Sequence, residues 1–426
     1  MREMETAIQQ RISGRAYRRA LSDPTARSFV ASYGLDRVAA WTASVAIVTL
    51  SYRLTEDVGI VALFVLTQVL ARLFVGPVGA SFFQQGKWTL AIASVTRIAA
   101  AGSLVFVSSR GDLGWALVSI GLMSGASVVI EGAQSQLIPA VASGRGLPVF
   151  NRLIGRVEQL SAVVGAVIAG LILFAAAEGA AFAGATLLFA GSMTVLHRRN
   201  WLTGSKKQPL LAPMGASLER MLHHPVLRLV AVGIIAVAAL GAVIRVTLID
   251  VVIDHLEYAS GHYGLLLGLV GLGALIGPLP IHKLLGRIGI GFVVTGSVIM
   301  LALGMVVLGL ANHVAIMIPI LLASGVLIVT CDLVAAVTLR RLIPEDDLDG
   351  TTRVTMGAVL GGQLLGLVAV LGLSQLWSSS VVVTLVGTSW AIVLLVLFLS
   401  SNGPRLALAA STPSTRQPSP KNGDAE

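Results

Sequence analysis

Long apolar segments recur at short intervals along this chain of 426 residues. They fall at 27–52, 57–80, 88–109, 113–139, 153–175, 179–197, 226–252, 262–284, 289–310, 313–338, 353–374 and 379–400. Each is long enough to cross a bilayer, which takes about 20 apolar residues in a helix. Only 12% of the residues are charged, against about 25% in a typical soluble domain. The sequence therefore predicts an all-α integral membrane protein with twelve transmembrane helices.

The loops between these segments differ in charge. Basic residues gather in alternate loops, above all in the stretch 198–207, whereas Asp57, Asp112 and Glu178 lie in the loops of the opposite side. Because positively charged loops stay in the cytoplasm, we expect both termini to be cytoplasmic in a multi-pass protein of the cell membrane. The same rule accounts for the net charge of +9, so we expect no nucleic-acid partner.

The sequence contains an internal repeat. Three features recur at a constant offset of 201 (225−24, 228−27 and 277−76): Pro24 and Pro225, Arg27 and Arg228, and the Gly-Pro pairs at 76–77 and 277–278. The tripeptide Leu-Ile-Pro recurs at 137–139 and 342–344, a slightly larger offset (342−137) that a short insertion would explain. A parallel duplication of this kind predicts two pseudo-symmetric six-helix bundles with a substrate site between them.

The repeat and the loop composition divide the chain into five expected segments. These are a cytoplasmic amphipathic or basic segment at 1–24, a first bundle at 25–198, a linker at 199–224, a second bundle at 225–401 and a disordered tail at 402–426. Segment 1–24 is either a helix lying on anionic lipid or a partly disordered basic tail. The stretch Ser22-Asp23-Pro24 is typical of a helix start, with a capping side chain before a proline.

Ionisable residues inside the apolar segments are the best evidence for a site, because each costs about 2.5–3.5 kcal/mol at the bilayer centre. Glu131 and Asp332 are separated by the same offset as the other repeat marks (332−131), so both halves carry an acid at the equivalent place. We weigh two roles for them. Either acid is a structural lock that pairs with nearby cations, or it is a proton-coupling carboxylate. The expected lock partners are Lys87 and Arg156 in the first half, and Lys283 and Arg353 in the second.

Further candidates lie in the first three segments, namely Asp36 and Arg37, Arg72, and Arg97. Arg97 is the deepest cation, and it either neutralises Asp36 or Glu131 or faces an anionic substrate. Pairing of Asp36 with Arg72 is an alternative, and Arg72 is also a candidate for the substrate cavity.

In the seventh segment, Arg245, Asp250 and Asp254 cluster towards the outer end, where an outer gate or a solvated face is the favoured interpretation. Arg245 is nevertheless kept as a candidate for the substrate cavity. Gln159 and Gln363, in the fifth and eleventh segments, are further cavity candidates, although hydrogen bonds between helices are the commoner use of such residues.

Signatures of soluble enzymes are absent from the sequence. There is no phosphate-binding Walker loop and no HExxH zinc motif, and Cys331 is the only cysteine, so neither an internal disulfide nor a thiolate metal cluster can form. We expect no enzyme activity, no cofactor and no metal site.

Three stretches resemble the macrolide-efflux and siderophore-export branch of the major facilitator superfamily (MFS). They are the turn Gly34-Leu35-Asp36, the run from Ala71 to Pro77, and the segment from Asn151 through Glu158 to Gly170. The family's gate loop follows the second span, and its counterpart lies in the second half. The matching residues here are Gly76, Pro77 and Lys87, and Gly277, Pro278, Lys283 and Arg287. The loop departs from the family pattern, because Gln84 or Gln85 stands where an aspartate is expected.

The resemblance implies a monomeric secondary transporter in the lipid bilayer that works by alternating access. It would be an antiporter that uses the proton gradient to export a small, largely apolar molecule, such as a drug or a secreted metabolite. The missing gate acid leaves a transport-inactive scaffold or sensor as one alternative, and uptake or lipid flipping by the same fold as another.

Overall fold

The computed structural model describes residues 21–82, 87–142, 147–197, 214–278, 290–311, 313–343 and 348–400, together with Tyr17. Over these residues the chain is helical and contains no strand. Most of segment 1–24, most of the linker and all of the tail 402–426 lie outside the described residues, so the expectations for them stay predictions. Within the expected linker, the helix α9 (Met214–His223) is described.

Twelve longer helices coincide with the twelve apolar segments. They are α3 (Pro24–Thr55), α4 (Val58–Phe82), α5 (Lys87–Ser103), α6 (Leu113–Val141), α7 (Leu147–Ala175), α8 (Glu178–His197), α10 (Pro225–Asp250), α11 (Gly261–Ile276), α13 (Ile290–Gly309), α14 (Val314–Leu342), α15 (Leu348–Leu373) and α16 (Ser379–Ser400). Nine candidate spans in the described chain are long and apolar enough to cross a membrane, and 261–276 and 379–393 are shorter apolar helices. Helix α3 is not among the nine, because Asp36, Arg37 and two further arginines interrupt it. The chain is thus a multi-pass membrane protein, and the count of twelve crossings stays a prediction.

The internal repeat reappears in the helix boundaries. Helices α3, α6, α7 and α8 begin at one constant offset before α10, α14, α15 and α16 (225−24, 314−113, 348−147 and 379−178), which is the offset of the sequence repeat. The ends of α6 and α14 show the same offset (342−141). The short insertion suggested by the two Leu-Ile-Pro tripeptides is therefore wrong. The first tripeptide, including Pro139, lies inside α6. In the second, only Leu342 belongs to α14, which ends there, so the two tripeptides are not at equivalent positions.

Local chemistry explains where α3 and α10 begin. The Asp23 side chain accepts a hydrogen bond from the backbone N–H of Thr25 at 2.9 Å, and Pro24 occupies the first turn, as the sequence predicts. Pro225 takes the same place in α10. We call the end of the bundle at Pro24 and Pro225 the linker end. We call the opposite end the far end, where α3 stops at Thr55 and α10 continues through a π-helical turn to His255.

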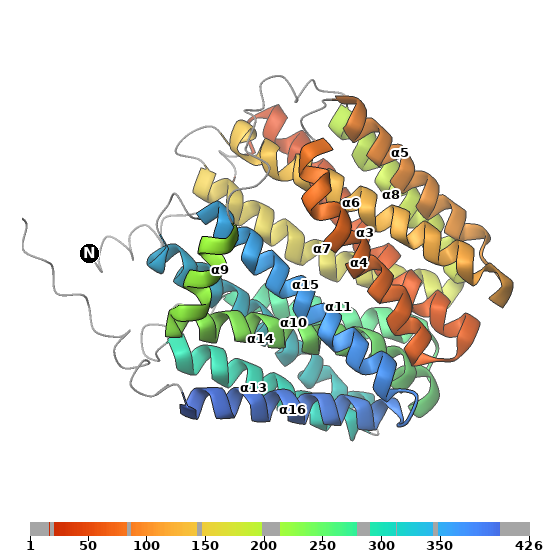
Figure 1. Ribbon diagram of the computed structural model, residues 1–426. Helices are drawn as coiled ribbons and strands as arrows, with labels where there is room; N and C mark the ends of the chain where they lie inside the picture. Colours follow the sequence, from red (N-terminus) through yellow and green to blue (C-terminus); the bar gives the residue numbers. More distant parts are fainter. Residues whose placement is uncertain are drawn as a thin grey trace, which may run out of the picture.

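Helices α3 to α8 pack together as one bundle, and α10 to α16 as another (Figure 1). The bundles meet mainly where α7 packs on α11 and α4 packs on α15. Glycines allow the first contact, because a Cβ atom on Gly264 would stand 2.7 Å from the Gly170 backbone. The sequence predicts close packing at Gly165, Gly170, Gly361, Gly362 and Gly366. This holds for four of them, but a Cβ atom on Gly361 would have no described atom within 4 Å.

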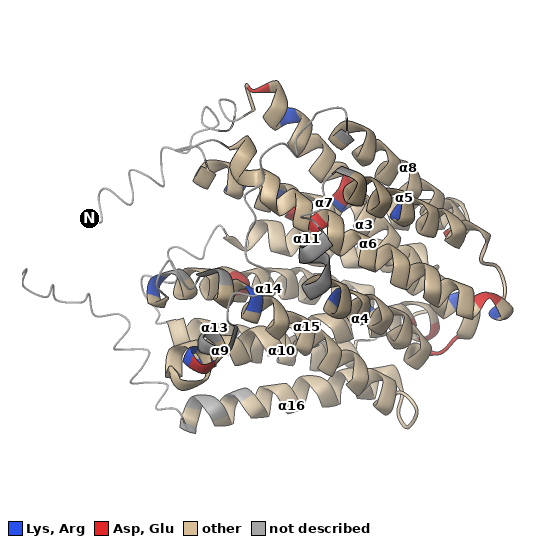
Figure 2. Ribbon diagram, turned by 45° about the horizontal axis from the view of Figure 1, so that its top comes forward, with Lys and Arg blue, Asp and Glu red and all other residues tan. Residues whose placement is uncertain are grey.

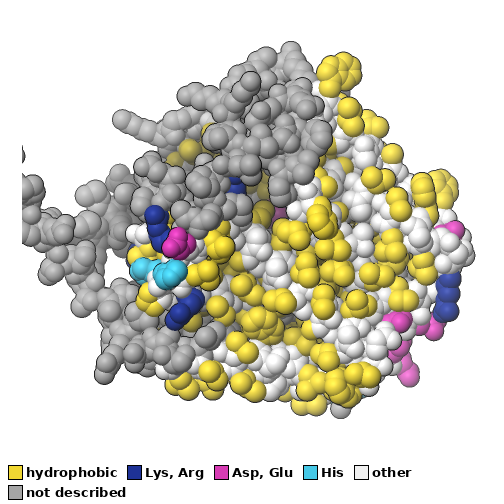
Figure 3. All heavy atoms as spheres, viewed as in Figure 1, with side chains coloured by type: hydrophobic (Ala, Val, Ile, Leu, Met, Phe, Trp, Pro, Cys, Tyr) yellow, Lys and Arg dark blue, Asp and Glu magenta, His cyan; other side chains and the backbone are white. Residues whose placement is uncertain are grey.

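Many large apolar side chains lie on the outer surface. Phe74 (69% exposed), Trp88 (80%), Leu187 (74%) and Leu376 (71%) are examples. Figure 3 shows hydrophobic side chains spread over the visible face, and Figure 2 shows most charged residues at helix ends, with one cluster within the bundle around α3 and α7. Such a surface would cause aggregation in water, whereas it suits contact with lipid tails.

The far end is closed by contacts between the two bundles. The Tyr52 hydroxyl of α3 lies 2.7 Å from Asp250 and 2.6 Å from Asp254, which belong to α10 and its π-helical turn. The helices of the two bundles converge towards this end and diverge towards the linker end (Figure 1). The interior between the bundles is therefore shut off at the far end.

Candidate substrate cavity and its ion pairs

Two adjoining cavities lie between the bundles. Their volumes are about 340 and 240 Å³. Both are lined by Trp41, Val69, Arg245 and Gln363, which come from α3, α4, α10 and α15. Because the four shared residues come from both bundles, the cavities form one candidate site at the bundle interface.

The larger cavity is mostly apolar. Its aliphatic walls come from both bundles and include Val65, Val237, Ile244, Leu267, Val270, Ile328 and Leu367. Asp332 of α14 is the only carboxylate among its described lining residues, and its side chain is exposed. Asp332 lies about 15 Å from the linker end of α14 at 1.5 Å rise per residue. An exposed carboxylate at that depth indicates that the cavity is accessible from the linker end.

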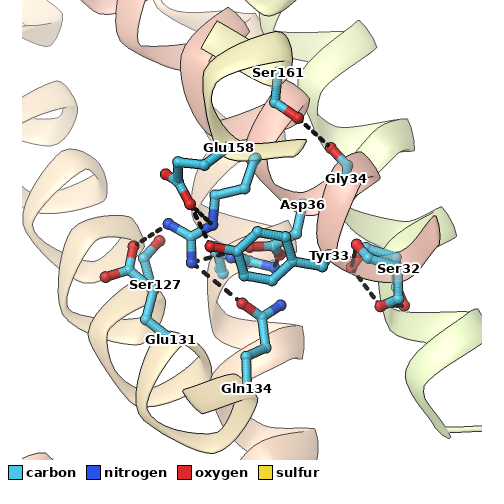
Figure 4. A network of polar contacts seen from close by, with 12 residues as sticks. Ser32, Tyr33, Gly34, Asp36, Ser127, Glu131, Gln134, Glu158 and Ser161 are labelled. Atoms are coloured by element: carbon cyan, nitrogen blue, oxygen red, sulfur yellow. Dashed lines mark hydrogen bonds and ion pairs between the residues drawn. The ribbon is translucent and has the colours of Figure 1, made fainter. Parts of the chain in front are cut away.

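In the smaller cavity, an ion-pair network surrounds Arg37 of α3 (Figure 4). Arg37 donates to Glu131 of α6 at 2.9 Å, and Arg72 of α4 reaches the same carboxylate oxygen at 3.2 Å. Arg37 also donates to Gln134 at 3.2 Å and lies 3.7 Å from the Glu158 carboxylate. One carboxylate thus joins three helices of the first bundle through two arginines.

Tyr33 and Glu158 complete this network. The Tyr33 hydroxyl donates to Glu158 of α7, and the Arg37 guanidinium lies 5.0 Å from the centre of the Tyr33 ring. Figure 4 shows Tyr33, Glu131, Gln134 and Glu158 pointing towards one another between α3, α6 and α7. With Arg72 of α4, four helices are therefore tied together near the linker-end side of the cavity.

Arg97 and Asp36 form a buried pair beside this network, and the Arg37 guanidinium lies 3.9 Å from the Asp36 carboxylate. Arg97 and Asp36 are in contact, with only 2% and 1% of their side chains exposed. The Arg97 guanidinium also stacks 4.1 Å from the centre of the Phe189 ring of α8. Arg97 thus neutralises Asp36 rather than Glu131, and neither residue lines the two cavities. The alternative pairing of Asp36 with Arg72 does not form, because Arg72 reaches Glu131 instead.

The two repeat-related acids have different surroundings. Glu131 contacts two arginines, whereas no cation of the described chain lies within 4 Å of the Asp332 carboxylate. The expected lock partners are wrong where they can be checked. Arg156 stacks on Tyr17 instead of reaching Glu131, and Arg353 does not pair with Asp332. The side chains of Lys87 and Lys283 lie outside the described residues.

The predicted cluster at the outer end of the seventh segment is split in the structure. Asp250 and Asp254 close the far end with Tyr52, whereas Arg245 turns into the cavities and donates to Gln68 of α4 at 2.8 Å. Residues 245 and 250 are five apart on α10, which places them on different sides of the helix.

The other candidate residues are only partly placed. Gln363 lines both cavities, whereas Gln159 is not among the residues that line them, so its role in a substrate cavity stays a prediction. In the gate loops, a Cβ atom added to Gly76 would have no described atom within 4 Å. A Cβ atom added to Gly277 would stand 3.1 Å from the Val326 carbonyl oxygen of α14. Pro278 follows Gly277 at the end of the described stretch, and the side chains of Pro77 and Lys87 are not described. Lys283, Arg287 and the glutamines at 84 and 85 lie outside the described residues.

Several residues of the site escape the sequence reasoning, Tyr33 and Gln134 of the ion-pair network among them. Neither Gln68 nor Trp41 is a sequence candidate, and Glu158 enters only as part of a family stretch. For Glu158 a signal exists, because a carboxylate within the apolar fifth segment needs a partner as much as Glu131 does. Gln68 carries the weaker signal that singles out Gln159 and Gln363, a glutamine inside an apolar segment. Trp41 carries none, since tryptophans also pack between helices.

No protein-family model and no curated protein sequence matches the chain. Its structure is similar to solved transporter structures. The nucleoside transporter NupG superposes with a TM-score of 0.70 at 12% identity, over 89% of this chain and 99% of that one. The chain has the major facilitator fold.

Two further transporters share this fold. A POT family transporter, solved in complex with a thioalcohol-conjugated peptide, gives a TM-score of 0.69 at 11% identity, over 89% of this chain and 96% of that one. A bacterial homologue of the human lysosomal transporter Spinster was solved in an inward-facing and unoccupied conformation. It gives a TM-score of 0.66 at 11% identity, over 92% of this chain and 100% of that one. At these identities the similarity concerns the fold, and the efflux branch suggested by the sequence stays a prediction.

Proposed function

We propose that this protein is a secondary active transporter that works by alternating access, with the two bundles rocking about the cavity. The observation that carries the proposal is a cavity between the bundles that is closed at the far end by Tyr52, Asp250 and Asp254. Transporters with this fold bind near the midplane at the interface of their halves. If both termini are cytoplasmic, the described state faces the cytoplasm.

We further propose that transport is proton-coupled and that Asp332 is the coupling carboxylate. A coupling acid must exchange its proton with water and must change its surroundings when the bundles move. Asp332 is exposed to the cavity, and none of the described cations holds it as a carboxylate. Glu131 is less suited to this role, because Arg37 and Arg72 both stabilise its charged form. Glu131 is therefore assigned the structural role of locking α3, α4 and α6 together.

The proposed direction is efflux of a small, largely apolar molecule, which the aliphatic walls of the larger cavity would accommodate. The direction is inferred from the resemblance of three sequence stretches to the efflux branch.

Flux in proteoliposomes tests the coupling assignment. The full chain is reconstituted, and uptake of a panel of labelled macrolides, dyes and lipids is followed with and without an imposed pH gradient. We expect Asp332→Asn to lose gradient-driven accumulation while keeping exchange of substrate for substrate, because exchange needs no net proton movement. Glu131→Gln should lower the yield of folded protein, and the folded fraction should still respond to the pH gradient.

The matched control is Glu219→Gln, which removes a carboxylate from the exposed surface of α9 and should change neither activity. Loss of gradient response in Glu131→Gln but not in Asp332→Asn would reverse the assignment. Absence of any flux in the wild type would favour the inactive scaffold, and comparison of right-side-out with inverted vesicles separates efflux from uptake or lipid flipping.

A further inference from the structure

Arg245 has an unusual environment for an arginine within the bundles. Its Nη2 atom donates to the neutral amide oxygen of Gln68 at 2.8 Å, and its buried Nε atom has no hydrogen-bond partner among the described residues. No carboxylate of the described chain lies within 4 Å of it, whereas Arg37, Arg53, Arg72 and Arg97 all have one. A guanidinium carries five N–H donors and keeps its charge, so this group has unused capacity for a negatively charged ligand.

The position of Arg245 makes that capacity available to a substrate. Arg245 lines both cavities, and it lies near their closed far-end side, ten residues from the end of the π-helical turn at His255. Gln363 lines the same two cavities, and Trp41 provides an aromatic wall between them. A ligand that enters from the linker end would therefore meet the guanidinium at the bottom of the cavity.

The acids nearest the cavity do not neutralise Arg245. Asp36 is occupied by Arg97, Glu131 by Arg37 and Arg72, and Glu158 by Tyr33 and Arg37.

Asp332 lines the larger cavity, but its depth differs from that of Arg245. Helix α14 starts at Val314 at the far end, and Asp332 lies five helical turns from that start. Arg245 lies fewer than three turns from His255, the far-end limit of its own helix. At 1.5 Å of rise per residue, the two backbone positions differ in depth along their helices by about 12 Å. In the described chain their side chains form no ion pair within 4 Å.

We propose that Arg245, with Gln68 and Gln363 beside it, binds the anionic group of the transported molecule. The substrate class is then an organic anion, with a carboxylate or sulfonate head on the guanidinium and an apolar body against Trp41 and the aliphatic walls. A planar guanidinium binds such two-oxygen heads through paired N–H···O bonds. This proposal rests on the proposed transport function, because it specifies the substrate of the same cavity.

A set of three probes with the same apolar body tests the charge preference. Naphthalene-1-sulfonate is anionic, naphthalene-1-sulfonamide is neutral and trimethyl(naphthyl)ammonium is cationic. Binding is measured as the ligand-induced rise of the melting temperature of the purified full chain in a neutral detergent. We expect the anion alone to stabilise the wild type, and Arg245→Gln to weaken its binding by about tenfold to a hundredfold, as for loss of a charged hydrogen bond.

A second variant guards against misfolding of Arg245→Gln. Gln68→Glu keeps the size of the side chain and places a carboxylate beside the guanidinium, so it should abolish anion binding without lowering the melting temperature of the free protein. Arg228→Gln is the matched control, because it removes an exposed arginine from the same helix. It should leave the affinity for the anion unchanged.

The outcomes separate this inference from the transport proposal. Equal stabilisation by all three probes, preference for the cation, or unchanged anion binding in both Arg245→Gln and Gln68→Glu would overturn the anion site, even if some other substrate is transported. Selective, Arg245-dependent binding of the anion supports the site, even if no flux follows in vesicles and the transport proposal fails.

Discussion

Removing one member of the Asp36–Arg97 pair should destabilise the first bundle strongly. In Asp36→Asn the guanidinium of Arg97, 2% exposed, loses its counter-ion and cannot reach water. Breaking a buried ion pair from one side costs about 3–5 kcal/mol, because the remaining charge is left uncompensated. The first bundle spans residues 24–197. For a domain of that size, about 2–4 °C of melting temperature corresponds to 1 kcal/mol, so the expected loss is roughly 6–20 °C.

The assay is thermal unfolding of the purified protein in detergent. Intrinsic tryptophan fluorescence reports on both bundles, because Trp41, Trp88 and Trp115 lie in the first bundle and Trp377 and Trp390 in the second. Labelling of Cys331 with a thiol-reactive fluorophore follows the second bundle, since this single cysteine is buried until the protein unfolds. The two signals together report whether damage beside Asp36 stays in the first bundle.

A double-mutant cycle decides whether the pair itself is responsible. Arg97→Gln alone should also destabilise the bundle, but by less than Asp36→Asn, because the buried Asp36 carboxylate keeps the Arg37 guanidinium at 3.9 Å. The double variant, with two neutral amides facing one another, should lose much less than the sum of the two. The reasoning would be refuted if each single variant lowered the melting temperature by less than about 2 °C and the double variant by the sum of the two. Such additivity is typical of independent surface groups and not of a buried ion pair.

Two further predictions concern the contacts between the bundles. Tyr52→Phe removes the hydroxyl that joins α3 to Asp250, worth about 1.5–3 kcal/mol for a hydrogen bond to a charged group. A cysteine introduced into the cavity lining should then react faster with an impermeant maleimide added at the far-end side. An unchanged reaction rate would show that Tyr52 does not hold that end shut. Gly264→Ala should cost about 1–3 kcal/mol and slow transport, because its Cβ would stand 2.7 Å from Gly170. Gly361→Ala, with no described atom within 4 Å, should be neutral or slightly stabilising, and equal melting temperatures for the two variants would contradict the close packing of α7 on α11.

How far the site follows from the sequence differs from residue to residue. The charged candidates Arg97, Asp36, Glu131 and Asp332 are conspicuous, because an ionisable residue in an apolar segment needs an explanation. Their partners are not predictable in the same way. Arg37 and Glu131 are distant in the sequence and meet only because α3 packs beside α6. Arg156, an expected partner of Glu131, stacks on Tyr17 instead.

The sequence by itself determined the helices, their boundaries and the twofold repeat. These features depend on local properties: apolar runs of sufficient length, Asp23 and the prolines at helix starts, and the constant spacing between equivalent positions of the two halves. Only the tertiary structure decided which acid is paired with described cations and which is not, because Glu131 and Asp332 occupy equivalent places in the repeat and differ only in what neighbouring helices bring to them. The same holds for Arg245, which the packing of α10 against α4 separates from the aspartates beside it in the sequence and turns into the cavity.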